Sequence, residues 1–312
     1  MNVVRVPVVL LVTSLLALAC GSPDVPETPP TPLSDIRLEP QESGTDVLLQ
    51  AVSAVDENVV WASGHGGTWV RTLDGGETWE MQFLNPEPDG FYDCLEFRDA
   101  KHGIVYGDAV DGELRILRTR DGGSTWEYTR SLDLPPALAG EGGFAASGTC
   151  VALGPGGRAW IGTGAADTAR VLTTLDDGRT WTAVPAPLPA GEAAGIFTIA
   201  FRDSLNGVIL GGDLSRPDEH TDNVAITSDG GVSWSLAGQP VFPGAVYGAA
   251  YVSGAPTPTL VAVGPHGADW SADEGATWSP ADTAAYWGLD IASPAAGWLV
   301  GPEGRIMRIS FE

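Results

Sequence analysis

The chain has 312 residues, with 40 Asp and Glu against 16 Lys and Arg, and a formal net charge of −24. This balance argues against binding to nucleic acid or to an anionic membrane surface by charge, since both need a cationic face. It is typical of a solvated acidic surface, and it permits cations or basic polypeptides as partners.

The N-terminus has the pattern of an export signal. Arg5 precedes an apolar stretch, residues 8–18, which is too short and too N-terminal for an ordinary membrane span. Small residues before Cys20, and Gly21 after it, resemble a bacterial lipoprotein signal, in which Cys20 is lipidated and begins the mature protein. We therefore expect a signal peptide over residues 1–19, with ordinary secretion as the alternative.

A Pro-rich segment follows over residues 20–34 and contains five prolines. Such a composition stays extended and does not pack a core, so it predicts a spacer between a lipid anchor and a folded domain. We expect a cell-envelope protein, periplasmic or surface-exposed, that reaches the membrane only through its lipid. Residues 35–312 are predicted to form one domain.

An eight-residue phrase, [Ser/Thr]-x-Asp-x-Gly-x-[Ser/Thr]-Trp, occurs five times in this domain, first from Thr72 to Trp79. Its aspartates recur at spacings of 47, 55, 53 and 44 residues, which is typical of propeller blades. The box residues are Asp74, Asp121, Asp176, Asp229 and Asp273, with Trp79, Trp126, Trp181, Trp234 and Trp278.

Each box has a structural interpretation. A Gly after Asp is typical of a tight hairpin, because Gly accepts a positive φ. The carboxylate can accept backbone N–H groups across the turn, the hydroxyls tie its ends, and the Trp fills the wedge against the next sheet. A residue repeated in every blade cannot lie in one active site, so we interpret the five aspartates as structural.

Three short apolar runs, bounded by Gly, Asp or Pro, precede each box and predict strands. Each unit then has four strands, with the box between the third and fourth; the first strand of the third unit is expected over residues 144–151. A sixth unit after the last box lacks its outer strand, which residues 35–40 could supply, closing the ring. The sequence thus predicts an all-β, six-bladed β-propeller of four-stranded antiparallel blades, with seven blades as the alternative.

The phrase is similar to the Asp-box (BNR) repeat of the sialidase-like superfamily. The longer pattern from Trp61 to Trp79 resembles the photosystem II stability/assembly factor family and its bacterial relatives. The resemblance covers residues 35–312 and implies the fold, since the shared motif is scaffold. Sialidases need an arginine triad and an Arg-Ile-Pro motif, which are not found here. The assembly factors are implied to hold a client on a basic patch, and no run of this chain predicts one.

A binding site is expected on the face opposite the boxes, where second strands turn into third strands and first strands begin. Gly107-Asp108 and Gly212-Asp213 occupy equivalent positions there. Their carboxylates could bind a hard cation or act as acid and base on a glycosidic bond, or they are simply solvated turns. The candidate face residues are Tyr92, Asp93, Asp108, Asp111, Glu141, Asp213, Arg216, His220, Tyr247, His266 and Trp287.

The sequence assigns no catalytic residue, metal site or cofactor. Cys94 and Cys150 lie in neighbouring units and are either a disulfide or two buried thiols. The leading hypothesis is a monomeric, tethered, non-catalytic scaffold or assembly factor that binds a protein or carbohydrate partner and no nucleic acid. The alternatives are a divergent sialidase-like glycoside hydrolase, with its carboxylates at the channel mouth, and a cation-dependent binding module.

Overall fold

The five boxes form the outer hairpins of five blades. In the computed structural model, Asp74 accepts hydrogen bonds from the Thr72 hydroxyl (2.7 Å), the Thr78 N–H (2.9 Å) and the Thr78 hydroxyl (2.6 Å). The same three bonds recur in the other four boxes at 2.6–3.0 Å. The hydroxyl donated by Thr78 is the largest cause that holds the pKa of Asp74 at about 2. Each aspartate therefore ties its own hairpin.

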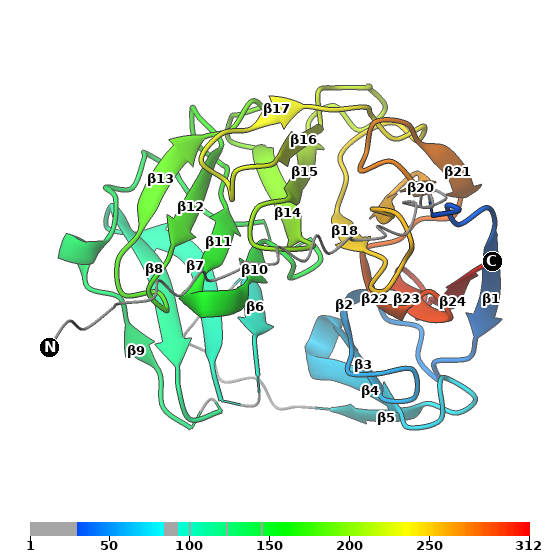
Figure 1. Ribbon diagram of the computed structural model, residues 1–312. Coiled ribbons are helices and arrows are strands. Elements are labelled where there is room, and N and C mark those ends of the chain that lie inside the picture. The colour runs from blue at the N-terminus through cyan, green and yellow to red at the C-terminus, as the bar shows by residue number, and fades with distance from the viewer. Residues whose placement is uncertain (1–29, 84–92, 100, 123, 145) are drawn as a thin grey trace, which may run out of the picture. The chain divides into compact units, whose positions relative to one another are not determined.

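The structure describes residues 30–83, 93–99, 101–122, 124–144 and 146–312. The chain divides into two units, Met1–Pro30 and Thr31–Glu312. In the second unit, the described strands form six four-stranded antiparallel sheets, which are the blades of a ring (Figure 1). The predicted six-bladed, all-β propeller is confirmed. The predicted signal peptide and Cys20 lie outside the described residues.

The blades follow one another along the chain. Blade 1 has strands β2 (Leu49–Ala54), β3 (Val60–Gly64), β4 (Thr68–Thr72) and β5 (Glu80–Phe83). Blade 2 has β6 (Cys94–Phe97), β7 (Gly103–Val110), β8 (Glu113–Thr119) and β9 (Glu127–Tyr128). Blade 3 has β10 (Val151–Leu153), β11 (Ala159–Gly162), β12 (Arg170–Thr174) and β13 (Thr182–Pro185). Short 3-10 turns lie at His65–Gly67 (η1), Ser131–Asp133 (η2) and Pro155–Gly157 (η3).

The second half of the domain repeats this arrangement of four strands per blade. Blade 4 has β14 (Ala194–Phe201), β15 (Gly207–Asp213), β16 (Val224–Thr227) and β17 (Ser235–Leu236). Blade 5 has β18 (Gly248–Tyr251), β19 (Leu260–Gly264), β20 (Gly267–Ser271) and β21 (Ser279–Asp282). Blade 6 has β22 (Gly288–Ser293), β23 (Ala296–Val300), β24 (Ile306–Phe311) and β1 (Ile36–Gln41). The part of the chain that the structure describes has no helix long and apolar enough to cross a membrane.

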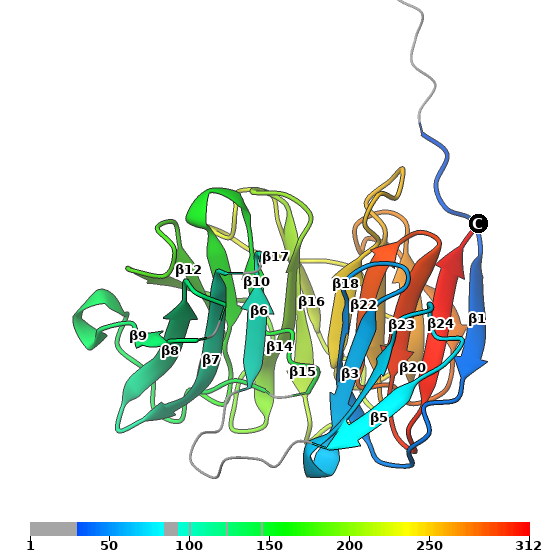
Figure 2. The same cartoon turned by 90° about the horizontal axis from the view of Figure 1, so that it is seen from below.

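The N-terminal strand completes the last blade, as predicted. β1 pairs antiparallel with β24 over six residues, from Ile36 opposite Phe311 to Gln41 opposite Ile306. Figure 2 shows β1 at the outer edge of blade 6, next to the C-terminus. Leu33 already packs against the apolar cluster of blades 5 and 6. The ring is therefore sealed there by backbone hydrogen bonds between the two ends of the domain.

One predicted strand is wrong. Residues 144–151 were expected to begin blade 3, but β10 starts only at Val151. The approach to it is a loop in which Gly142 bridges to Gly164 and Phe144 packs against Phe197, with tilted rings whose centroids are 4.2 Å apart. The loop therefore packs against the β11–β12 turn of its own blade and against β14 of blade 4, and it does not pair with β11 as a strand.

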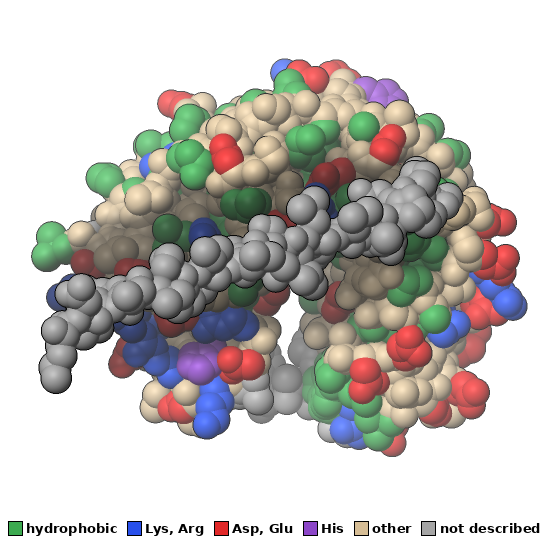
Figure 3. Space-filling model, viewed as in Figure 1, with side chains coloured by type: hydrophobic (Ala, Val, Ile, Leu, Met, Phe, Trp, Pro, Cys, Tyr) green, Lys and Arg blue, Asp and Glu red, His purple; other side chains and the backbone are tan. Residues whose placement is uncertain are grey.

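Buried apolar clusters fill five of the six seams between neighbouring blades. Trp160 fills the seam between blades 3 and 4, and Trp298 that between blades 6 and 1; both are fully buried. Among the described residues no such cluster lies between blades 1 and 2, where Trp61 is 37% exposed and Leu95 is 51% exposed. Figure 3 shows an opening at this seam.

Box tryptophans pack on the preceding blade in blades 1, 3, 4 and 5, whereas Trp126 lies against Phe97 of its own blade.

Cys94 and Cys150 are joined by a disulfide. Cys94 opens β6 and Cys150 directly precedes β10, and their Cα atoms are 5.6 Å apart. The bond therefore links blade 2 to blade 3 beside the central channel.

Candidate functional site

The face opposite the boxes carries an acidic cluster at blades 2 and 3. Asp93 precedes β6, Asp108 lies in the last part of β7, and Glu141 lies in the approach to blade 3. Asp93 and Glu141 are 6% and 2% exposed, whereas Asp108 is exposed. Arg170 neutralises Glu141, with Nε 2.9 Å from Oε1. The acidic character of the cluster therefore comes from Asp93 and Asp108.

Asp93 is the perturbed member of this cluster. Burial, and then the charge of Asp108, raise the pKa of Asp93 to about 7. Two carboxylates at one mouth repel each other's charge, so the buried one holds its proton to higher pH. The sequence predicted that these residues share a face, but it gave no sign that Asp93 is buried.

Asp213 belongs to a different local group. Its carboxylate accepts from the Ser215 hydroxyl (2.5 Å) and N–H (2.9 Å), and it lies 3.4 Å from the Arg216 guanidinium. The Ser215 hydroxyl is the largest cause that lowers the pKa of Asp213. Asp108 and Asp213 are equivalent in sequence position, but Asp213 is satisfied inside its own turn.

Aromatic side chains form a row across the same face. Tyr247 and Trp287 meet edge to face, with ring centroids 4.9 Å apart. The ring centroid of Tyr247 lies 5.9 Å from that of Phe197, whose ring packs at a tilt against Phe144. Phe144 and Phe197 were not predicted, because both look like ordinary core residues in the sequence.

The other predicted face residues are peripheral. Asp111 is exposed in the turn between β7 and β8, with φ 55°, and His220 is exposed. Nε2 of His266 lies 3.6 Å from Asp218. Tyr92 lies outside the described residues.

The central channel encloses a cavity of about 1640 Å³, lined mostly by first strands. Glu96 of β6 lines it, and burial followed by the charge of Asp290 raises the pKa of Glu96 to about 8. Asp290 of β22 accepts the Ala54 N–H at 2.8 Å, and burial raises its pKa as well. Sequence reasoning missed this pair, because the two residues are nearly two hundred positions apart.

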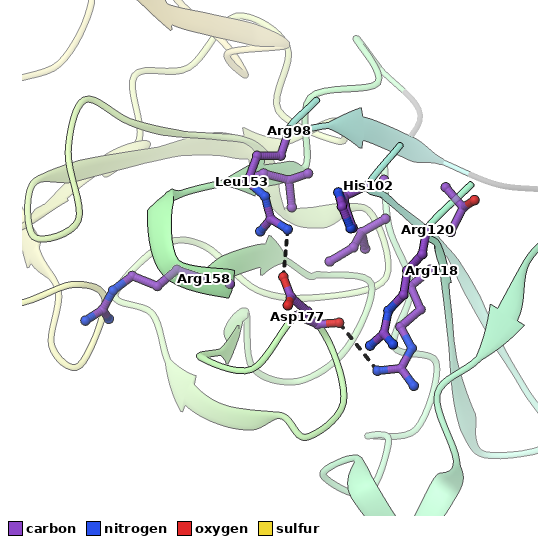
Figure 4. Close-up of a pocket in the computed structure, with 11 residues that line it drawn as sticks. Arg98, His102, Arg118, Arg120, Leu153, Arg158 and Asp177 are labelled. Atoms are coloured by element: carbon purple, nitrogen blue, oxygen red, sulfur yellow. Dashed lines mark hydrogen bonds and ion pairs between the residues drawn. The ribbon is translucent and has the colours of Figure 1, made fainter. Parts of the chain in front are cut away.

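A basic hollow lies on the box face between blades 2 and 3 (Figure 4). It is defined by five basic side chains and one acidic one: Arg98, His102, Arg118, Arg120, Arg158 and Asp177. Blue and purple side chains gather over blade 2 in Figure 3. In a chain with 16 Lys and Arg, four arginines around one hollow are a strong concentration of positive charge.

Three carboxylates neutralise part of this charge. Asp99 lies 2.8 Å from His102 Nδ1, Glu127 lies 3.6 Å from Arg118 Nη2, and Asp177 is the third. Nη2 of Arg98 lies 2.7 Å from Asp177 Oδ1, and Nη1 of Arg118 lies 3.4 Å from the Asp177 carbonyl oxygen. Arg118 Nε is buried, and no hydrogen-bond partner for it exists in the described part of the chain. Figure 4 shows Arg118 and Arg120 side by side, while Arg158 extends away from Asp177 at the rim.

The expectation that the chain offers no basic patch is thus incomplete. No run of sequence forms one, but turns and strands of two blades bring separate residues together. Arg98 and His102 come from the turn after β6, Arg118 and Arg120 from the end of β8 and its box, and Arg158 from the turn before β11. Only the fold places them side by side.

The fold defines the chain as a β-propeller with Asp-type boxes at its outer hairpins. No protein-family model matches the sequence, and no curated protein matches it. Solved structures do. YCF48 from Cyanidioschyzon merolae is 15% identical, with a TM-score of 0.58 over 88% of this chain and 98% of that one.

Two further structures align over most of their length. A structure of YCF48 bound to D1 peptide is 18% identical, with a TM-score of 0.45 over 90% of this chain and 99% of that one. A luciferin-regenerating enzyme is 9% identical, with a TM-score of 0.55 over 88% and 95%. The propeller fold that the resemblance implies is confirmed. Functions differ within this group, so the likeness extends to the fold and no further.

Proposed function

We propose that this propeller is a non-catalytic binding scaffold that binds an anionic segment of a protein partner on the arginine side chains around the basic hollow. The observation that carries the proposal is the concentration of Arg98, Arg118, Arg120 and Arg158 in a chain of net charge −24. Guanidinium groups bind carboxylates by paired, charge-assisted hydrogen bonds. The assembly factors that the sequence resembles are implied to hold their clients on a basic patch.

The acidic remainder of the surface supports this choice of ligand. Long-range repulsion from 40 acidic residues disfavours anionic partners everywhere except at a local positive potential. A partner with a short acidic stretch would therefore dock in one orientation, and salt would weaken its binding.

The test uses the full-length protein and a fluorescein-labelled hexaglutamate peptide, followed by anisotropy. Arg118→Ala with Arg120→Ala should weaken binding about tenfold or more, because charge-assisted hydrogen bonds contribute roughly 1.5–3 kcal/mol each. The control is Arg37→Ala, which removes an exposed arginine of blade 6 that pairs with Glu39. Equal affinity of the double variant and the control would overturn the proposal. Cross-linking from intact cells with the same pair of variants would then identify the partner.

We also propose that the protein is exported and anchored by lipid at Cys20, with residues 20–34 as a spacer. The signal-like N-terminus and the prolines of the spacer support this. Metabolic labelling with a radioactive fatty acid should mark the wild type but not Cys20→Ser, and the variant should leave the membrane fraction. Equal labelling of both would rule out this anchor.

A glycoside hydrolase remains the second candidate, and one observation favours it. A carboxyl group with a pKa of about 7, such as Asp93, suits a general acid, and Asp108 would be the second carboxyl group of the pair. Hydrolysis of any member of a glycan panel, lost in Asp93→Asn with the fold intact, would establish this function in place of simple binding. Inactivity on the whole panel would remove it.

A further inference from the structure

The central cavity is closed at one end by a segment of blade 3. Residues 147–149, which precede β10, line the cavity and reach the first strands of two other blades. The Ser147 hydroxyl donates to the carbonyl oxygen of Tyr247, next to β18, at 2.7 Å. The Thr149 hydroxyl donates to the Thr198 hydroxyl of β14 at 2.8 Å. This segment therefore blocks the channel toward the face opposite the boxes.

The other end of the cavity lies toward the boxes. It is lined by residues 252–259, which form the turn between β18 and β19. In an antiparallel blade this first turn lies on the same face as the turn between third and fourth strands. Trp61 and Trp69 of blade 1 line the side of the cavity at the open seam toward blade 2. A ligand can therefore enter from the box face or through this seam.

The cavity has room for a small molecule, and its walls are mainly apolar. Its volume of about 1640 Å³ exceeds the roughly 300–1,000 Å³ of ordinary small-molecule sites. Each of the six first strands contributes an apolar side chain to the wall: Val52, Leu95, Leu153, Ile199, Ala250 and Leu289. An apolar ligand body placed against these side chains would be removed from water, which stabilises a complex.

The charged side chains of the wall leave it negative. There are four of them, and three are acidic: Asp93, Glu96, Arg202 and Asp290. Arg202 is neutralised outside the cavity wall, by Glu274 at 2.7 Å and by Asp203 at 2.8 Å. Within the described ranges of the chain, none of the three acidic side chains forms an ion pair with a basic one. Charge complementarity therefore favours a cationic ligand.

Two of these carboxyl groups are placed to contact a ligand. Glu96 of β6 and Asp290 of β22 are half-buried and line the cavity, whereas Asp93 is almost fully buried. After burial, the charge of Asp290 is the cause that raises the pKa of Glu96, so the two groups lie close enough to repel each other. The backbone N–H of Leu153 is the only hydrogen-bond donor that lowers the pKa of Glu96. Glu96 thus retains capacity to accept hydrogen bonds from a ligand.

We propose that the cavity binds an amphiphilic amine, a small molecule whose apolar body lies against the first strands and whose primary ammonium group lies at Glu96 and Asp290. An ammonium has three N–H donors and no acceptor, and its charge offsets the repulsion between the two carboxylates. An inorganic cation would leave the apolar walls unused. The described residues also contain no group of three or more His, Cys, Asp or Glu side chains that could hold a metal ion. This site is distinct from the basic hollow, and its ligand has the opposite charge.

The experiment titrates the full-length protein with octylammonium chloride by isothermal titration calorimetry. Octanol is the uncharged probe, and methylammonium is the probe without an apolar body. Glu96→Gln should weaken octylammonium binding about tenfold, because it removes a charged acceptor. The matched control is Glu192→Gln, the same change at an exposed residue outside the cavity wall, and it should change affinity less than twofold. Ser53→Trp, at an exposed position of β2 that lines the cavity, should weaken both octylammonium and octanol by filling part of the volume.

The pH dependence gives a second readout. Glu96 holds its proton up to a pKa of about 8, and an ammonium binds its ionised form, so binding at pH 7 should release a proton. Affinity should then rise from pH 6 to pH 8, by up to about tenfold per unit, and the apparent enthalpy at pH 7 should differ between phosphate and Tris buffers. Asp93 and Asp290 also have raised pKa values, while Arg202 stays paired, so Glu96→Gln should reduce this dependence without abolishing it.

Four outcomes would overturn the proposal. Octanol binding as tightly as octylammonium would mean that the charge is not recognised, and equal binding of methylammonium would mean that the walls take no part. An equal loss in Glu192→Gln would mean diffuse attraction to an acidic protein. Unchanged affinity in Ser53→Trp would place the probe outside the cavity. If Glu96→Gln fails to fold, Ser53→Trp and the pH dependence of the wild type still decide the matter. The arginines tested with hexaglutamate do not line this cavity, so the two proposals fail separately.

Discussion

The residue that follows each box aspartate adopts a left-handed conformation. Glycine fills this position in three boxes, but Asp177 (φ 61°) and Glu274 (φ 60°) fill it in the other two. A non-glycine residue there costs roughly 1–2 kcal/mol. Both exceptions contact an arginine of the preceding blade: Arg98 reaches Asp177 at 2.7 Å, and Arg202 reaches Glu274 at 2.7 Å. We infer that the ion pair between blades offsets the backbone strain.

Substitutions at the Arg202–Glu274 pair test this offset. Arg202→Ala should destabilise the protein by about 1 kcal/mol, because it leaves the strain and removes a two-point ion pair at 2.7 and 3.3 Å. Glu274→Gly alone should be nearly neutral, and in the Arg202→Ala background it should restore stability. Urea unfolding measures each change. A Glu274→Gly variant that only adds to the loss of Arg202→Ala would show that the left-handed backbone carries no strain.

Among the elements, β1 does more than complete the last sheet. Gln41, its last residue, accepts with Oε1 from the indole N–H groups of Trp79 (3.2 Å) and Trp298 (3.1 Å). Its amide donates to the Gly75 carbonyl oxygen at 3.1 Å. Trp79 belongs to blade 1 and Trp298 to blade 6, so one side chain ties the N-terminal strand to both blades.

We therefore expect Gln41→Leu to lower the free energy of unfolding strongly, although the two side chains are similar in size. It leaves two indole N–H groups without an acceptor, one of them on the fully buried Trp298, for a loss of about 2 kcal/mol. Gln41→Glu keeps the acceptor for both indoles but sets a carboxylate oxygen against the Gly75 carbonyl oxygen in place of a donor, so it should cost less than Gln41→Leu but more than the loss of one bond. Differential scanning calorimetry measures both. Equal losses for the two variants would place the effect in β1 packing rather than in the bridge.

Elements with local signals could be predicted from the sequence, and those made by contacts between blades could not. The boxes fix the turn between third and fourth strands, because Asp, Gly and Ser/Thr close that turn by their own hydrogen bonds. The loop before β10 was misread as strand because its apolar residues pack on another blade. Asp93 and Asp108 were rightly placed on one face, but the burial of Asp93 depends on the close approach of the Gly143 backbone, where a Cβ would lie 2.8 Å from Asp93 Oδ2. The basic hollow is built from residues of two blades, so no single stretch of sequence predicts it.

Across the whole molecule, the ionisable groups with shifted pKa values fall into two sets, which change the stability of the fold in opposite directions as pH rises. The box aspartates have lowered pKa values, about 2 for Asp74 and Asp229. They favour the folded state above their ordinary value of 3.8, and this contribution is lost as pH falls toward 2. Carboxyls near the channel behave in the opposite way: the pKa rises to about 7 for Asp93 and about 8 for Glu96.

These two sets predict a stability maximum in acidic solution, near pH 4. Between their ordinary values (3.8 and 4.5) and their folded values, Asp93 and Glu96 hold more protons in the folded state than in the unfolded one. The free energy of unfolding therefore falls as pH rises, by up to about 1.4 kcal/mol per pH unit for each group. This stabilisation is complete below the ordinary values and is lost as pH passes through about 7 and 8.

Thermal melts at pH 5, 6, 7 and 8 test the prediction, and the melting temperature should fall steadily across the series. Asp93→Asn with Glu96→Gln should flatten the slope, because neither amide titrates. Asp108 faces Asp93 and Asp290 faces Glu96, so their charges are part of the repulsion that the double variant removes. The control is Asp111→Asn, an exposed carboxylate of the same face, which should leave the slope unchanged. A melting temperature that rises from pH 5 to pH 8 would mean that the channel carboxyls ionise freely in the folded protein.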